Sequence, residues 1–176
     1  MKTREPPFEH FYDLADLSEA GAEMAIRPSA QQRSQLAQWA GVTSVDRFEA
    51  TVTLRRRSAS RFAYDAVLAA DIEQSCVVTL EPVRSHIGLN IHRELHVISA
   101  APKFAPAGGE IATAGDEGPE EIEGTRFDLA APVLEEFLLA IDPYPRAPGV
   151  EFVRPPSPEA PPESPFAVLG KLKGKS

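Results

Sequence analysis

Four side chains that could do chemistry lie close together in the sequence: Cys76, the only cysteine, and the histidines His86, His92 and His96. A cysteine reacts or binds metal as the thiolate, which needs a nearby cation or helix N-terminus and some exposure. Apolar residues alternate through this region, which predicts a strand with Cys76 on its apolar face, where neither condition is met. We therefore expect Cys76 to be a small, buried side chain of the core rather than a nucleophile.

The three histidines share the polar face of the predicted strand that follows. A strand rises about 3.3 Å per residue, so His92 and His96 would be about 13 Å apart, too far to bind one metal ion. We expect them to be separate surface side chains, with no metal site and no cofactor.

Motifs typical of enzymes do not occur in the chain. It has no Gly-x-Ser-x-Gly nucleophile elbow, no glycine loop that binds phosphate and no His-Glu-x-x-His pair. Glu135 and Glu136 fall on the polar face of a predicted helix, where solvation is the expected state. We predict a protein that is not an enzyme, with no catalytic residues and no small-molecule substrate.

The stretch "RRRSASR" (55–61) places Arg55, Arg57 and Arg61 around a predicted hairpin turn. Like charges that face each other across a hairpin are destabilising, so we expect a negatively charged group to offset their repulsion. One explanation is an external anion such as RNA phosphate, which arginine binds bidentately. The other is internal: Asp65, or the segment 110–124 with six carboxylates and no base, neutralises the cluster.

Composition indicates one domain followed by a tail. The chain has 176 residues, 43% of them hydrophobic, and its net charge of −8 disfavours coating of nucleic acid but permits a focused phosphate contact. We predict a single domain over 1–153, then a Pro-rich linker and a short basic C-terminal helix or tail over 154–176. The N-terminus lacks a secretory signal, and no run approaches the ~20 apolar residues of a membrane span, so we expect a cytoplasmic location without membrane contact.

Strand periodicity is the strongest structural signal. Apolar residues occupy even positions in 48–54 and 62–72 and odd positions in 87–97, which predicts an antiparallel meander with one wet face. Matching these faces requires a three-residue loop at 58–60, which sets Arg57 opposite Arg61. A four-residue turn at 82–85 would pair Leu80 with Ile87 and Cys76 with Ile91.

Two helical patterns flank the strands. The first begins at the N-cap Ser29 and ends at Gly41, with Leu36, Trp39 and Ala40 pointing inward. The second starts near Asp128 and ends before Pro143, with a stripe that includes Leu138. An acidic loop over about 102–124 precedes it. The predicted fold is an α+β domain: a curved antiparallel meander sheet, with barrel-like closure as one variant, and two main flanking helices.

Three stretches together resemble one known family: "CVVTLEPV" (76–83), "DPYPRAPGVEF" (142–152) and "PFAVLGKLKGK" (165–175). The chain is similar over about 20–175 to the YceD-like family, named for accumulation of large-subunit ribosomal RNA, and the second stretch resembles its proteobacterial subgroup. We interpret the signature residues as structural. They are Cys76, Thr79, Leu80, Glu81, Pro82, Asp142, Pro143, Tyr144, Pro145 and Arg146.

The resemblance implies a non-enzymatic accessory factor in large-subunit ribosome biogenesis. Its partner would be ribosomal RNA, a large-subunit precursor or a basic ribosomal protein. The candidate RNA contacts are Arg55, Arg57, Arg61, Lys171 and Lys173. Many family members carry further cysteines where this chain has "DPYPRAPG", so no metal site carries over. The alternative is a protein–protein adaptor that holds a basic partner through the acidic loop.

Overall fold

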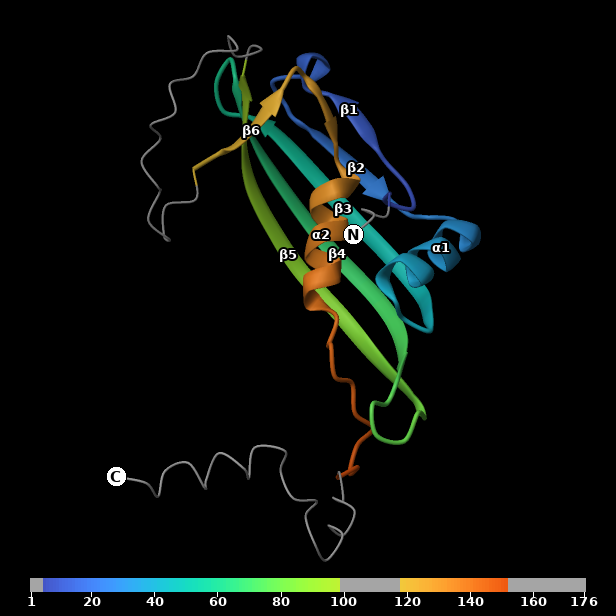
Figure 1. The fold of residues 1–176 in the computed structure, drawn as a ribbon. Coiled ribbons are helices and arrows are strands. Elements are labelled where there is room, and N and C mark those ends of the chain that lie inside the picture. The colour runs from blue at the N-terminus through green and yellow to red at the C-terminus, as the bar shows by residue number, and fades with distance from the viewer. Residues whose placement is uncertain (1–4, 99–117, 152–176) are drawn as a thin grey trace, which may run out of the picture.

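The computed structural model describes residues 5–98 and 118–151, which form an α+β domain (Figure 1). Its elements are β1 (Phe11–Asp13), the 3-10 helix η1 (Leu14–Asp16), β2 (Ala22–Ile26), α1 (Ala30–Ala40), β3 (Ser44–Arg56), β4 (Arg61–Ser75), β5 (Pro82–Ile98), β6 (Glu120–Glu123), β7 (Arg126–Asp128) and α2 (Ala130–Ala140). One sheet has the order β2-β3-β4-β5-β6, and β1 pairs separately with β7. The predicted α+β class with two helices is confirmed, and the sheet is open rather than barrel-like.

The sheet has one buried face and one exposed face because its long strands alternate as the sequence predicts. Even positions of β3 and β4 and odd positions of β5 face the core, where α1 and α2 cover them. An edge-to-face contact between the rings of Phe48 and Phe137, 5.3 Å between centroids, joins β3 to α2. We call the opposite, uncovered side the outer face of the sheet. Its centre includes Val67, of which 58% is exposed.

Helix α1 begins and ends at the predicted residues. The Ser29 hydroxyl accepts from the Gln32 N–H, the Gln32 side chain accepts from the Ser29 N–H, and Gly41 closes the helix in the left-handed conformation. Leu36 is fully buried, whereas Trp39 and Ala40 are only half-buried at the edge of the core.

Helix α2 packs its apolar stripe against β4 and β5. Phe137 is fully buried, and the Asp128 carboxylate accepts from the Ala130 N–H at 3.0 Å. The expectation that Leu138 belongs to the buried stripe is wrong, because more than a third of this residue is exposed near the end of the helix.

The register of the first hairpin is confirmed. Arg56 pairs with Phe62, and the Arg57 N–H donates to the Arg61 carbonyl at 2.8 Å, which places these two arginines opposite each other. Face matching alone was sufficient for this prediction because both strands have long, unbroken alternation.

The register of the second hairpin is wrong. Strand β4 ends at Ser75, which pairs with Pro82, and Ile91 pairs with Ala66 instead of Cys76. The turn is 76–81, where the Cys76 N–H donates to the Glu81 carbonyl at 2.8 Å. Its apolar residues alternate like a strand although their backbone is folded into a turn. Leu80, expected opposite Ile87, is therefore exposed.

The acidic loop prediction is wrong at its C-terminal end. Glu120–Glu123 forms strand β6, which runs parallel to β5 and makes the sheet mixed rather than antiparallel. The rest of that prediction, over 102–117, and the predicted linker and tail over 154–176 lie outside the described residues.

Neither α1 nor α2, the two α-helices of the described residues, has the length and apolar character needed to cross a bilayer.

Candidate nucleic-acid interface

The β3–β4 hairpin carries the three arginines singled out in the sequence. Arg55, Arg57 and Arg61 are all exposed, and their odd positions place them on the outer face of the sheet. Neighbours two apart on a strand are about 7 Å apart, and residues opposite each other across a hairpin are about 5 Å apart. The structure therefore brings the three positions into one cluster, which we call the arginine hairpin.

None of these three arginines forms an ion pair with another of the described residues. Other arginines of the sheet do. Arg47 binds Glu49 at 2.7 Å, and Arg84 binds Glu73 at 3.2 Å. The arginine hairpin thus holds positive charge on the outer face of the sheet without a carboxylate partner in the described part of the chain.

Arg56 was not among the predicted site residues, and it has a structural role. Its guanidinium donates to the carbonyl oxygens of Leu14 and Leu17 at 3.1 and 3.0 Å and lies 4.9 Å from the Phe62 ring centroid. Its even position was the available signal, because it directs this side chain towards the core side of the sheet.

Acidic groups near the hairpin have separate roles. Asp65, proposed as an internal partner of the arginines, binds His92 at 2.7 Å instead, so that part of the expectation is wrong. Arg61 pairs with His96, and His96 pairs with Glu121 of β6. One row across the sheet therefore runs from two arginines through a histidine to a glutamate.

The histidines are surface side chains, as predicted. His86 binds Asp71 at 2.7 Å in the same way that His92 binds Asp65. Among the residues that the structure describes, no three histidine, cysteine, aspartate or glutamate side chains are grouped so that they could hold a metal ion.

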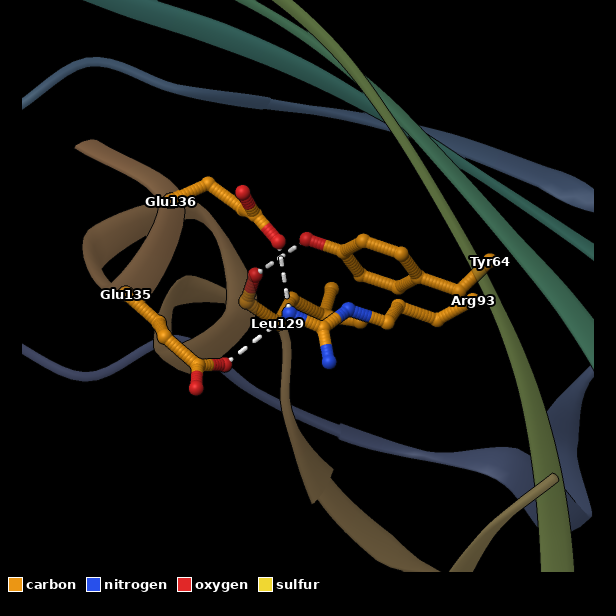
Figure 2. A network of polar contacts seen from close by, with 5 residues as sticks. All are labelled: Tyr64, Arg93, Leu129, Glu135 and Glu136. Atoms are coloured by element: carbon orange, nitrogen blue, oxygen red, sulfur yellow. Dashed lines mark hydrogen bonds and ion pairs between the residues drawn. The ribbon is translucent and has the colours of Figure 1, made fainter. Parts of the chain in front are cut away.

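Glu135 and Glu136 are not merely solvated, which corrects another expectation. Arg93 of β5 donates to both carboxylates, at 3.0 and 2.7 Å, and so links the middle of α2 to the sheet (Figure 2). Beside it the buried Tyr64 hydroxyl donates to the Leu129 carbonyl at 2.8 Å. Burial raises the pKa of Tyr64 far above its ordinary value. Sequence alone gives no signal for these contacts between distant elements.

A hollow of about 580 Å³ is lined by His92, Arg93, Glu94, Gly118 and Glu120. It is one of several hollows among the described residues that ionisable side chains line. Its histidine and arginine are already engaged, by Asp65 and by the carboxylates of α2. Two of its potential catalytic groups are thus already bound to carboxylates of the domain.

Cys76 is fully buried, as predicted, but its surroundings are not those of a strand. Its Sγ accepts from the N–H groups of Val78, Thr79 and Ala147 at 3.4 to 3.5 Å. The Thr79 hydroxyl, followed by the N–H groups of Ala147 and Thr79, lowers the pKa of this thiol to about 6. The expectation that nothing stabilises the thiolate is wrong, because backbone donors of a turn supply what a strand could not.

The structure brings two of the family-like stretches together. The Val77 N–H donates to the Pro145 carbonyl and the Gln74 side chain to the Asp142 carbonyl, both at 2.9 Å. Within the turn, the Glu81 N–H donates to the Thr79 hydroxyl at 3.4 Å. These contacts agree with a structural role for residues 76–82 and 142–146. Lys171 and Lys173 lie outside the described residues.

Comparisons of the chain with protein-family models, with curated proteins and with solved structures found no match.

Proposed function

We propose that this protein is a cytoplasmic, non-enzymatic accessory factor in large-subunit ribosome biogenesis, and that its arginine hairpin contacts ribosomal RNA or a large-subunit precursor. The observation that supports this most is the set of Arg55, Arg57 and Arg61, which are exposed and have no carboxylate partner among the described residues. The resemblance to the YceD-like family supports the ribosomal setting.

The charge distribution favours a local contact over general binding. A net charge of −8 repels the phosphate backbone from most of the surface, so affinity depends on a local group of exposed arginines such as the arginine hairpin. Each guanidinium group can bind two oxygens of one phosphate. Three such groups in one cluster can bind neighbouring phosphates of a folded RNA.

The test is sedimentation of the tagged full chain with ribosomal particles at low and high salt. We expect co-migration with large-subunit precursors that is lost in Arg55/Arg57/Arg61→Ala. The matched control is Arg27/Arg47/Arg84→Ala, which removes the same charge from exposed positions elsewhere on the domain. Loss in both variants, or in neither, would contradict the proposal for the hairpin.

An adaptor is the second candidate function. It is favoured by β6, an edge strand on which Glu120, Glu121 and Glu123 are all exposed. These carboxylates could hold a basic ribosomal protein. In that case Glu120/Glu121/Glu123→Gln abolishes partner capture, and the triple arginine variant leaves it intact.

A further inference from the structure

Exposed apolar side chains extend from the end of α2 to the β4–β5 turn. Most of the large apolar residues that the described part of the chain exposes belong to the 76–81 turn, the end of α2 and the segment after it; they are Val77, Leu80, Leu138, Leu139 and Tyr144. We call this group the apolar end. The 76–81 turn of this group lies at the opposite end of β4 from the arginine hairpin, and the end of α2 lies between that turn and the middle of the sheet (Figure 1).

The apolar end is built on a fixed frame. The Val77 N–H donates to the Pro145 carbonyl, the Gln74 side chain to the Asp142 carbonyl, and the Ala147 N–H to the Cys76 sulfur. These bonds tie the chain that follows α2 along the β4–β5 turn. A hollow of about 390 Å³ beside them is lined by Val77, Pro143 and Pro145 together with residues of the α1–β3 connection.

Leu80 is the least expected residue of this group. It is the only residue other than glycine, among those described, with a positive φ (64°), and 78% of it is exposed. A leucine rarely adopts this conformation, where glycine or asparagine is favoured. The described part of the domain leaves this side chain exposed. An exposed apolar side chain in an unfavourable backbone conformation is typical of a surface that binds a partner.

The surroundings of the apolar end are acidic. The exposed carboxylates here are Glu81, Asp142 and Glu151, against the guanidinium of Arg146 and that of Arg84, which is already paired with Glu73. A ligand that matches both features is an apolar segment carrying positive charge.

The chain itself contains such a segment. The described residues end at Glu151, shortly after the bond from Ala147 to Cys76, and 25 residues of the sequence follow. Within 165–173 the apolar Phe166, Leu169 and Leu172 recur every third residue, and no acid occurs after Glu163. The intervening residues 152–164 are rich in proline and span up to about 40 Å when extended, enough to reach any part of this end.

We propose that the apolar end binds segment 165–173 of the same chain, with Phe166, Leu169 and Leu172 covering its exposed side chains. Lys171 and Lys173 then lie near the acidic groups around the apolar end instead of contacting RNA. This contact is independent of the proposed function, because no residue of the apolar end belongs to the arginine hairpin.

The test is proximity in the full chain, measured with a short thiol cross-linker. Leu169→Cys is combined with Leu139→Cys or with Tyr144→Cys, and Cys76 is retained because it is fully buried. The matched control combines Leu169→Cys with Val67→Cys, an exposed apolar position on the outer face of the sheet. We expect the intramolecular cross-link to form at least about tenfold faster at the apolar end than at the control.

Two further measurements separate the outcomes. Adding Phe166→Ser and Leu172→Ser to the fast pair should reduce its rate to that of the control, with the fold checked by circular dichroism. Equal rates at all positions, or a rate that the serine substitutions leave unchanged, overturn the proposal. A cross-link between two chains that grows with protein concentration also overturns it, because the occupant is then a second copy.

Discussion

The sulfur of Cys76 accepts a hydrogen bond from the Ala147 N–H at 3.4 Å and so joins two turns 71 residues apart in the sequence. The same sulfur accepts from two N–H groups of its own turn. Cys76 therefore organises the β4–β5 turn and holds the segment after α2 against it, a role that needs an acceptor and not only a small apolar volume.

Replacing this acceptor should destabilise the protein. Cys76→Ala leaves the N–H groups of Val78, Thr79 and Ala147 without their shared partner. We expect the melting temperature to fall by on the order of 5 °C, and by less in Cys76→Ser, which retains an acceptor. Val77→Ala, a substitution at the exposed neighbour, is the control and should have little effect. Equal melting temperatures for wild type and Cys76→Ala would contradict this role.

The same thiol should make stability depend on pH. Its pKa is lowered from the ordinary 9.0 to about 6, so between these values the folded protein binds fewer protons than the unfolded chain. The free energy of unfolding should therefore rise with pH across this window. The gain should be complete above pH 9 and lost as the pH falls through 6.

Urea midpoints at pH 6, 7.5 and 9 check this expectation. Histidines and other groups also titrate, so the informative quantity is the difference between wild type and Cys76→Ser at each pH. A difference that stays constant, or one that shrinks as the pH rises, would show that the folded thiol is not acidic.

Removing the hydroxyl of Tyr64 should lower the stability of the protein. It is fully buried, and its hydroxyl donates to the Leu129 carbonyl at 2.8 Å. Tyr64→Phe removes this bond to the carbonyl of the α2 N-cap residue and should lower the free energy of unfolding by about 1 kcal/mol. Chemical denaturation measures this, with the exposed Tyr144→Phe as a control that should stay near wild type.

The β3–β4 hairpin shows how far the sequence can be read. Its register follows from alternation on two long strands, because a slip of one residue would expose every core side chain. The helix that starts at Ser29 was equally predictable, since its N-cap and its terminal glycine are local signals.

The 76–81 turn shows why other parts of the fold could not be predicted from the sequence. Its apolar residues alternate as in a strand, and what folds them into a turn is a contact with Pro145 and Ala147, far away in the sequence. Strand β6 was missed because its glutamates carry no strand signal and it pairs in parallel with a distant partner. The bonds from Arg93 to Glu135 and Glu136 likewise depend on how α2 packs on the sheet.

The facing arginines of the arginine hairpin should lower the stability of the fold and strengthen RNA binding. Arg57 lies opposite Arg61, whereas Arg55 pairs with the uncharged Ala63. Arg57→Thr removes the repulsion and should raise the free energy of unfolding by about 0.5 kcal/mol while it weakens RNA binding. Arg55→Thr is the matched control, because it changes the same side chain without a like charge opposite. If Arg57→Thr is no more stable than Arg55→Thr, the arginines do not repel each other in the folded protein.

Salt dependence should reveal whether the arginine hairpin touches phosphate directly. Each phosphate contact releases counterions and adds about 0.9 to the slope of log affinity against log salt on a duplex, and about 0.7 on a single strand. Binding of the full chain to a large-subunit ribosomal RNA fragment should therefore lose about two to three units of slope in Arg55/Arg57/Arg61→Ala if all three side chains bind phosphate. Arg27/Arg47/Arg84→Ala changes the net charge equally and should keep the wild-type slope. A wild-type affinity that does not vary with salt would exclude direct phosphate contact, and equal slopes in the two variants would mean that RNA responds to overall charge and not to this turn.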